Sequence, residues 1–570
     1  MARIVVDPVS RIEGHLRIEA NLDGGKISDA WSSGTMFRGI EMILKGRDPR
    51  EAWIWAQRIC GVCTMVHAIT SVRAVEDALK IEVPENARIV RNLIAGAQMV
   101  HDHVVHFYHL HALDWVDVAA ALKADPARTS QIAQSISDCD KSSAKYFKGV
   151  QQRVQGVVAS GQLSLFASGY WGHPAYTLPP EVNLLAVAHY LEALAWQKDF
   201  IRIHAVLGGK NPHPQSFLVG GMSTAMDPDE PAAVITPERI NFIRDLVRGA
   251  LKFVNDYYIP DVLAIAPLYK DWFGRGEGLG NFLAYGDYSS GDQSDPKTFL
   301  FPRGIVMGRD ISKVFPVDPA KITESVAHSW YEYSGGENGA KHPSQGETVP
   351  RYSGPQAPFE HLDVNAKYSW LKAPRYDGQP MEVGPLARMV VGYASGKKEI
   401  KDAVDGALKA LNAPPTVLFS TLGRIAARAL ESQLMARALE GWVNQLEQNL
   451  AHGKTAIFNP IRWDPDSWPS SAGGYGWHEA PRGALGHWVE IEGKSIRNYQ
   501  AVVPTTWNAG PRDAQGQRGA YEAALLNTPV ADPNRPLEIL RTIHSFDPCI
   551  ACAVHVVDAQ GREYTIPRVA

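Results

Sequence analysis

The 570-residue chain has few cysteines, no excess of basic residues and no long apolar run. Five cysteines in a chain of this length exclude a disulfide-stabilised scaffold. A formal charge of −4 excludes the strongly basic surface that nucleic acid requires. Apolar runs of about 18 or more residues are absent, and the first residues have the pattern of a strand rather than of a signal peptide. We therefore expect neither a membrane span nor an export signal in this chain.

Four of the five cysteines form two Cys-x-x-Cys motifs at opposite ends of the chain, Cys60–Cys63 and Cys549–Cys552. Each motif is followed at a short offset by a histidine, His67 or His555. Thiolates in such pairs select zinc, iron or nickel. A redox dithiol and a structural four-cysteine zinc site are the alternatives, although structural zinc sites usually close over a few tens of residues. We predict one metal site assembled from both ends of the chain, and the spacing does not name the metal.

The pattern of helices and strands predicts a mainly α (α+β) fold with a central bundle of long helices and a small N-terminal sheet. Alternation in the first thirty residues indicates a hairpin that turns at Asp23-Gly24-Gly25. Sequence rich in Gly, Ser, Asp and Pro indicates a loop-rich lobe at about 268–360 and an irregular segment at about 453–487. Helices are expected from Asp48 as a cap to Cys60, and at about 84–115, 181–207, 237–258, 398–411 and 422–450. No linker marks a domain boundary.

Two further patterns have weak functional interpretations. Five histidines lie between His101 and His111, and His103 and His106 share a helix face, as metal ligands would. A histidine on an apolar helix is more often a hydrogen-bonded core residue, and we favour that interpretation. Residues 208–211 contain only part of a phosphate-binding loop, so we do not predict nucleotide binding.

A series of motifs in a fixed order identifies a resemblance. Some of them are weak individually, but their order is highly specific. The chain resembles the large subunit of nickel-iron hydrogenases over essentially its full length, and among these the membrane-associated uptake enzymes. The motifs are DPVSRIEGH (7–15), FRGIE (37–41), RICGVC (58–63), GYWGHP (169–174), APRG (480–483), VPTTWN (503–508) and DPCIACAVH (547–555).

The resemblance implies a nickel ion and an iron that carries carbon monoxide and cyanide. By this resemblance Cys60 and Cys549 bind nickel terminally, whereas Cys63 and Cys552 bridge nickel and iron. Hydrogen is a very weak acid, so its heterolytic cleavage needs an electrophile for the electron pair beside a base for the proton. We expect Cys549 to accept the proton first and Glu13 to carry it onward.

Other residues are assigned by the same resemblance. Arg482 lies above the open metal face, where its alternative role is electrostatic positioning, because a guanidinium stays protonated. Asp102 and Asp547 are expected to fix Arg482. His67 is expected to hydrogen-bond a bridging sulfur, and Thr505 with the backbone beside Pro504 to hold a cyanide. Taken alone, each of these residues is equally consistent with an ordinary cap or core polar group.

A separate magnesium site and a gas route are also implied. Glu41, the carbonyl of Ala501 and the imidazole of His555 are expected to bind Mg²⁺, for which hard oxygen ligands are typical. Val62 and Leu110 match positions that line the gas route in the family. An apolar residue at either position is equally consistent with ordinary core packing.

The resemblance makes residues 1–555 the catalytic subunit and 556–570 an extension that an endopeptidase removes after nickel insertion, aided by maturation chaperones. Cys139 alone cannot hold an iron-sulfur cluster, so electrons must leave through an obligate iron-sulfur small subunit to a membrane acceptor. Export with that subunit places the protein on the periplasmic side of the membrane. The runner-up is a non-catalytic four-cysteine zinc scaffold, which leaves Arg482 and Glu13 unexplained.

Overall fold

The computed structural model describes residues 2–550 apart from 162, 164, 165, 228, 231, 292–294, 337, 338 and 357. Its α-helices are α1 (Ile40–Leu44), α2 (Ala52–Ala56), α3 (Val66–Leu79), α4 (Glu85–Val105), α5 (Pro126–Ile136), α6 (Ala144–Ala159), α7 (Pro180–Phe200), α8 (Arg202–Gly208), α9 (Pro237–Phe253), α10 (Ile259–Ile265), α11 (Pro385–Ala394), α12 (Lys398–Ala410), α13 (Thr421–Ala451), α14 (Pro504–Ala509), α15 (Ala520–Leu525) and α16 (Leu537–His544).

The strands are short outside two three-stranded sheets. They are β1 (Ala2–Val6), β2 (Leu16–Asp23), β3 (Lys26–Gly34), β4 (Phe217–Leu218), β5 (Gly221–Met222), β6 (Phe282–Ala284), β7 (Asp287–Ser289), β8 (Phe299–Phe301), β9 (Gly304–Val306), β10 (Ile322–Ser325), β11 (Ala373–Tyr376), β12 (Ser471–Ala480), β13 (Gly483–Glu492) and β14 (Ser495–Val502). The prediction of a helix-rich chain with small sheets is confirmed. The lobe at about 268–360 contains only short elements, as its composition indicated.

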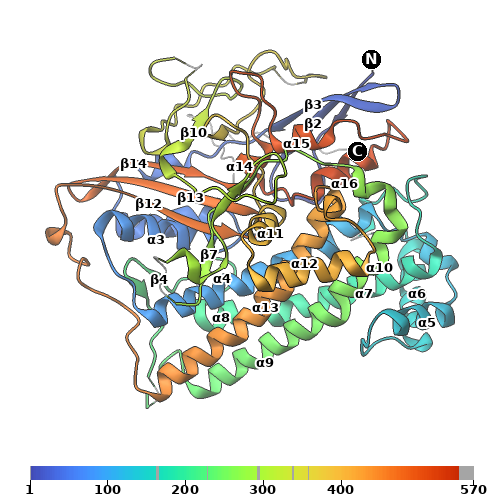
Figure 1. Cartoon of the computed structure of the whole chain (residues 1–570), viewed down its shortest axis with the longest axis horizontal. Helices are drawn as coiled ribbons and strands as arrows, with labels where there is room; N and C mark the ends of the chain where they lie inside the picture. Colours follow the sequence, from blue (N-terminus) through green and yellow to red (C-terminus); the bar gives the residue numbers. More distant parts are fainter. Residues whose placement is uncertain are drawn as a thin grey trace.

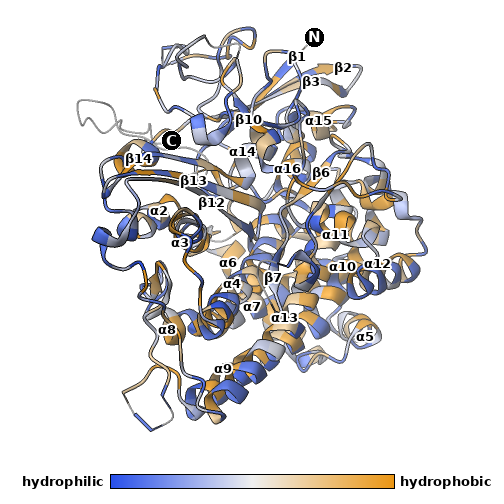
Figure 2. Cartoon of the chain, turned by 60° about the vertical axis from the view of Figure 1, so that its left-hand side comes forward, coloured by the Kyte–Doolittle hydropathy of each residue, from blue (hydrophilic) through white to orange (hydrophobic). Residues whose placement is uncertain are grey.

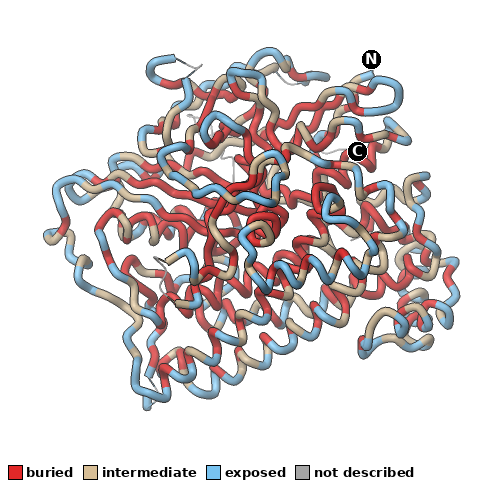
Figure 3. The backbone as a smooth tube through the Cα atoms, in the orientation of Figure 1, coloured by how far each residue is buried: buried red, intermediate tan, exposed pale blue. Residues whose placement is uncertain are grey.

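Long helices occupy one half of the molecule, and sheets and loops occupy the other (Figure 1). Helix α13 packs against both α4 and α9. The largest group of buried apolar residues joins these helices to α3 and to the sheet that packs on it. Figure 3 shows the buried residues gathered in the interior, with exposed residues on the outer loops and along the outward faces of the peripheral helices. In the described part of the chain, no helix is long and apolar enough to cross a membrane.

The N-terminal sheet joins the beginning and the end of the described chain. Strands β1, β2 and β3 form an antiparallel meander, and Gly24 and Gly25 supply the left-handed conformation that its second turn requires. The buried face of this sheet packs on apolar residues of α15 and α16, among them Tyr521 and Ile543. The predicted hairpin is therefore confirmed, and its packing brings the C-terminal segment beside the N-terminal one.

The predicted helices are present, but several of them change geometry; the one predicted at 237–258, for example, runs as α9 to Phe253 and ends in a π-helical turn, η7 (Val254–Tyr258). The helix predicted at 84–115 runs as α4 to Val105 and then widens into a π-helical turn, η3 (His106–His111), within the histidine-rich segment. The helix predicted at 181–207 is divided into α7 and α8. Helix α13 begins as predicted, because the Ser420 hydroxyl accepts the amide hydrogen of Gly423.

The prediction of an irregular segment at about 453–487 is wrong in its second half. Strands β12 and β13 are each ten residues long and form an antiparallel sheet with β14. Glycine-rich sequence in β12 obscured the strand pattern, and the structure shows why glycine is there. A Cβ at Gly476 would lie 2.3 Å from the carbonyl oxygen of Thr70, and one at Gly474 would lie 2.3 Å from the amide nitrogen of Ala78. These glycines let α3 lie directly on β12.

Candidate metal centre

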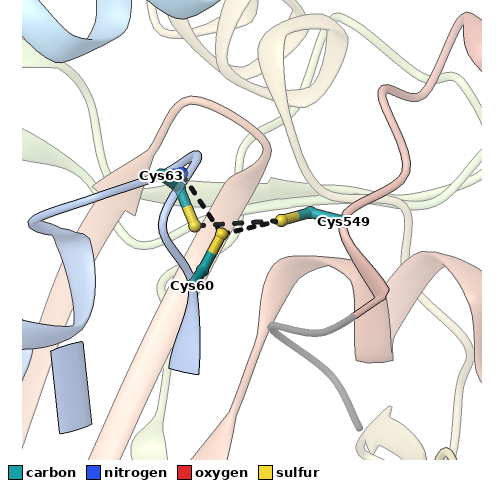
Figure 4. A group of neighbouring side chains, drawn as sticks. All are labelled: Cys60, Cys63 and Cys549. Atoms are coloured by element: carbon teal, nitrogen blue, oxygen red, sulfur yellow. Dashed lines mark hydrogen bonds between the residues drawn. The ribbon is translucent and has the colours of Figure 1, made fainter. Parts of the chain in front are cut away.

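Three cysteines from the two ends of the chain meet in the interior. The Sγ atom of Cys549 lies 3.4 Å from that of Cys60 and 3.8 Å from that of Cys63. Figure 4 shows the three side chains pointing toward one another from two separate segments. All three are buried, and their sulfur atoms lie within 4.8 Å of one another. Among the described residues, no other group of histidine, cysteine and carboxylate side chains has this arrangement. Cys552 and His555 lie outside the described residues.

The first cysteine pair is held by a capped helical turn and the start of α3. Asp48 accepts the amide hydrogen of Arg50 and starts the segment that runs through η1 (Pro49–Glu51), α2 and η2 (Gln57–Ile59) to Cys60. The amides of Val62 and Cys63 then donate to Cys60 Sγ at 3.3 and 3.2 Å. Such donors favour the thiolate over the thiol, so the backbone prepares Cys60 to be a ligand.

Cys549 is positioned by the N-terminal segment. Glu13 and Cys549 form a parallel bridge in which the Ile550 amide donates to the Glu13 carbonyl at 2.8 Å. The same contact places the Cys549 sulfur 3.4 Å from a Glu13 carboxylate oxygen. The Cys549 amide donates to the Thr505 hydroxyl oxygen at 3.2 Å, where α14 begins just after Val503. The thiol, the carboxylate and Thr505 therefore meet although they lie on three distant segments.

One side of the cluster is charged. Arg482, in the turn between β12 and β13, donates to Asp102 at 3.0 Å and to a side-chain oxygen of Asp547 at 3.1 Å. It also donates to the Asp547 carbonyl at 3.1 Å. Burial acts to lower the pKa of Arg482, but Asp547, Cys549 and Asp102 outweigh it and raise that pKa well above its usual value. The guanidinium is therefore a permanent cation beside the thiols.

A pair of histidines beside the cluster is neutral. His67, in the first turn of α3, has its Nδ1 atom 3.0 Å from Nε2 of His487. Burial lowers the pKa of His67 to about 4, and burial together with His67 lowers the pKa of His487 well below its usual value. The remaining His67 nitrogen, Nε2, is buried and has no hydrogen-bond partner among the described residues. His67 lines a small cavity with Cys63, Cys549, Arg482 and other residues.

This arrangement fits a thiolate-bound metal better than a disulfide. A disulfide has its sulfur atoms about 2.05 Å apart, whereas the Cys549 sulfur lies 3.4 Å from that of Cys60 and 3.8 Å from that of Cys63. Thiolates about 2.3 Å from a shared metal ion lie about 3.8 Å from one another in tetrahedral geometry, close to the separations observed here. His67 lines the same cavity, and its buried Nε2, which has no partner among the described residues, is suited to donate a hydrogen bond to a metal-bound sulfur or ligand.

Glu41 and Ala501, the two predicted magnesium ligands that the structure describes, line a separate polar pocket. One carboxylate oxygen of Glu41 accepts the Ala501 amide hydrogen at 2.9 Å, and the other accepts the Thr348 hydroxyl. Lys372 lies 3.9 Å from Glu41 and 3.6 Å from Glu324, and burial raises the pKa of Glu324 to about 7. The cavity between these groups measures about 30 Å³, which is room for one small ion or water. Its oxygen-rich lining suits a hard cation.

The structure shows the exposure of the two gas-route positions and the partners of the clustered histidines. Val62 is 42% exposed, whereas Leu110 is partly buried. His103 binds the Glu431 carboxylate at 3.0 Å and His106 binds the His544 carbonyl at 2.6 Å, so the two rings have separate partners. This is the hydrogen-bonded core role that we favoured.

Two supporting residues were missed by the sequence analysis. Arg388, on α11, is fully buried and donates to the carbonyls of Ala480 and Pro481, immediately before Arg482. His487 lies on β13 beside His67. No motif marks either residue, because each acts across tertiary contacts. His487 follows the APRG motif by a few residues in the sequence, whereas Arg388 contacts that motif only in the folded chain.

A centre built of cysteine thiols, a buried guanidinium and a carboxylate is consistent with metal binding, and the comparisons identify the class of protein. Residues 38–555 match the family "Nickel-dependent hydrogenase", and residues 3–33 match "HoxL-like". The chain is 54% identical to the uptake hydrogenase large subunit of Bradyrhizobium diazoefficiens, covering 98% of this chain and 96% of that one. It is 49% identical to the hydrogenase-1 large chain of Escherichia coli, with the same coverage.

A solved structure agrees with these sequence relatives. The Ni-Fe-Se hydrogenase from Desulfovibrio vulgaris Hildenborough in the as-isolated oxidised state superposes with a TM-score of 0.76 and 35% identity, covering 97% of this chain and 100% of that one. The chain belongs to the nickel-dependent hydrogenase family, and its fold is that of the hydrogenase large subunit. It is an uptake hydrogenase large subunit in class, an oxidoreductase that activates H₂ at a nickel-iron centre. The zinc-scaffold alternative has no support.

Proposed function

We propose that Cys60, Cys63, Cys549 and Cys552 hold the nickel-iron pair, and that H₂ is cleaved heterolytically at this cluster. The observation that supports the assignment is the convergence of three buried thiols with Glu13 and a permanently charged arginine. When bound, the metals supply the electrophile that takes up the electron pair of H₂. The chain itself must supply the base, the proton carrier and a dry, preorganised cavity.

Cys549 is the first proton acceptor and Glu13 the next carrier. Their 3.4 Å separation is within direct transfer range, because catalytic hydrogen bonds often tighten once the site is loaded. Arg482 acts by charge and hydrogen bonding rather than as a base, since its neighbours keep it protonated. Asp102 and Asp547 hold it over the cluster.

Thr505 and the backbone at Pro504 hold a cyanide of the iron. The Thr505 hydroxyl oxygen already accepts from Cys549, so its hydrogen is available to donate into the cavity that both residues line. Glu41 and Ala501, with His555, hold Mg²⁺ in the polar pocket described above, where the carboxylates of Glu41 and Glu324 offer hard oxygen atoms.

Residues 1–555 form the mature subunit and 556–570 a removable extension. The family match ends at residue 555, which supports this boundary. An uncut chain is expected to be inactive, and maturation chaperones and an endopeptidase are the implied partners. We also infer export with the small subunit to the periplasmic side of the membrane, electron delivery to a membrane acceptor, and a helical bundle formed by α4, α7, α9 and α13.

Electrons leave through a surface next to the cysteine loop, which we call the α1–α2 surface. It consists of Met42, Ile43, Ile54 and Val62, each between 38% and 44% exposed. Helices α1 and α2 pack on each other, and Val62 lies between two proposed metal ligands. Exposed apolar residues grouped this way mark a protein interface. We assign this surface to the iron-sulfur small subunit, since Val62 places an exposed apolar side chain between Cys60 and Cys63 in the sequence.

Elemental analysis of the purified complex, with the C-terminal mass of the same sample, tests the metal assignment. We expect about one nickel and one iron per large subunit after the iron of the partner is subtracted. We also expect the chain in that sample to end at His555. Zinc in their place with residues 556–570 intact would overturn it.

A charge in the α1–α2 surface tests the docking assignment. Ile54→Glu is expected to abolish co-purification of the small subunit because it buries an unpaired carboxylate in an apolar contact. Leu268→Glu is the control, since Leu268 is similarly exposed, at 41%, on the distant segment after α10. Equal recovery of small subunit from both variants would sink the assignment.

A further inference from the structure

A chain of three buried side chains leads away from the thiol cluster. His67 lines a small cavity together with Cys63 and Cys549, and its Nε2 atom is buried with no hydrogen-bond partner among the described residues. Its Nδ1 atom lies 3.0 Å from His487 Nε2. On its far side, His487 Nδ1 lies 2.6 Å from the Tyr499 hydroxyl. All three residues are at most 1% exposed, so water does not compete for these contacts. The two imidazole rings are inclined by 28° with their centroids 5.2 Å apart, as expected for rings that meet edge to edge through a hydrogen bond.

The packing of α3 on the second sheet creates this chain. His67 is in the first turn of α3, His487 is on β13 and Tyr499 is on β14. Gly476 on β12 leaves no room for a side chain between strand and helix, because a Cβ there would meet the Thr70 carbonyl at 2.3 Å. The close approach lets His67 reach across to β13. Figure 2 shows α3 lying along the β12–β14 sheet, seen from a second direction.

The chemistry of the sulfur end fixes the direction of every hydrogen bond. A thiolate only accepts, so His67 must carry its hydrogen on Nε2 to face it. Burial keeps both imidazoles neutral, and a neutral imidazole has one donor and one acceptor. His67 Nδ1 is then the acceptor, His487 must carry its hydrogen on Nε2, and His487 Nδ1 must accept from the Tyr499 hydroxyl. The reverse direction leaves His67 with an acceptor facing a thiolate.

We propose that His487 and Tyr499 are positioning residues that hold His67 as the Nε2–H tautomer, so that it donates to a cysteine sulfur of the metal centre. This chain of hydrogen bonds, which we call the Tyr499–His487–His67 relay, ends on that sulfur and withdraws electron density from it. Hydrogen bonds to sulfur ligands, and the partners that orient a ligand's neighbours, tune the potential of a metal centre. Aligned hydrogen bonds also polarise one another, so Tyr499 acts on the sulfur although it does not touch it. This inference rests on the proposed thiolate ligands.

Variants at His487 separate tautomer control from packing. His487→Leu removes the donor to His67 Nδ1, whereas His487→Gln keeps an amide donor at that place. We expect the purified His487→Leu complex to show a lower reduction potential and carbon monoxide infrared bands at lower wavenumber, because the sulfur becomes a stronger electron donor. His487→Gln is expected to stay near the parent in both measurements.

Tyr499→Phe is the gentler test, because it removes only the first hydroxyl of the relay. A smaller shift in the same direction is expected. Tyr108→Phe is the matched control, since Tyr108 is also buried and donates to Asp261 at 2.7 Å away from the cluster. It is expected to leave the bands unchanged.

The outcomes distinguish this inference from the proposed function. If His487→Leu and Tyr499→Phe both retain nickel and iron and show the parent's infrared bands and reduction potential, the relay is overturned. The ligand assignment would remain intact in that case. Should His487→Leu lose its metals, Tyr499→Phe decides alone: shifted bands support the relay and parental bands contradict it. A parent complex without nickel and iron would overturn the proposed ligand set itself.

Discussion

The histidine-rich run from His101 to His111 and the cysteine cluster contain equally good metal ligands but use them in opposite ways. In the run, the rings contact different residues: His103 contacts Glu431 on α13, His109 the Tyr190 carbonyl on α7, and His111 the Arg541 carbonyl on α16. In the cluster, three thiols from two distant segments lie within 4.8 Å of one another. The potential ligands of the histidine-rich run are therefore distributed over separate partners, whereas those of the cysteine cluster are concentrated at one place.

The difference teaches that ligand density along a sequence is a poor guide to a site. A helix turns about 100° per residue, so neighbouring side chains point to different neighbours. The π-helical turn at His106–His111 changes the angles but still directs His106, His109 and His111 to separate partners. A metal centre instead requires segments that the fold holds face to face, as the bridge between Glu13 and Cys549 does.

The largest effect is expected from removing one concentrated ligand. Cys63→Ser should abolish nickel binding and H₂ oxidation, because a hydroxyl is a poor ligand for soft metals. Cys139→Ser is the matched control, since Cys139 is equally buried, at 4% exposure, but lies outside the cluster. It should keep full metal content and activity. Metal content and hydrogen uptake are measured on both complexes. Equal metal loss from both variants would contradict the claim that the cluster, and not any buried cysteine, holds the metal.

Removing a distributed ligand should affect stability but not metal. His103→Ala leaves the Glu431 carboxylate with Arg388 as its remaining partner and opens a cavity on α4. Loss of a buried hydrogen bond costs about 1–3 kcal/mol. We expect a lower thermal midpoint with nickel and iron at the parent level. Metal loss without a change in thermal midpoint would indicate that His103 belongs to the site after all.

Sequence patterns could predict what depends on local chemistry. The caps at Asp48 and Ser420 and the hairpin turn at Gly24 are set by neighbouring residues, and all three are present. Ligand type and motif order pointed to Cys60, Cys63 and Cys549, which the structure brings together. These features need no knowledge of how distant elements pack.

Tertiary packing decided what the sequence could not show. Strand β12 was missed because its glycines have low strand propensity, yet they are needed where α3 lies on the sheet. His487 joins the site only through that contact, and Arg388 only through two backbone carbonyls beside Arg482. No local pattern marks a residue that acts through another element.

The close approach of α3 to β12 can be tested directly. Gly476→Ala places a Cβ against the Thr70 carbonyl and the Ala74 amide, so helix or strand must shift. Overpacking of this kind costs about 1–3 kcal/mol. Gly249→Ala is the control, because nothing lies within 4 Å of a Cβ there on α9 and alanine favours a helix. The first variant should lower the thermal midpoint and the second should not; equal midpoints would refute the steric argument.

The smallest expected effect is a pH dependence of stability in the distributed region. Burial lowers the pKa of His109 to about 4, below its unfolded value of about 6.5. Between these values the unfolded chain binds the extra proton, so stability falls as the pH drops from about 6.5 toward 4, by at most about 1.4 kcal/mol per pH unit. His109→Gln retains a donor for the Tyr190 carbonyl but has no charge to gain. Between pH values near 7 and 5, the thermal midpoint of His109→Gln should fall less than the parent's. The reason is that the glutamine binds no proton in the unfolded chain, whereas His109 does. Identical pH profiles would mean that His109 is already solvated, and the region would then be less tightly packed than its hydrogen bonds indicate.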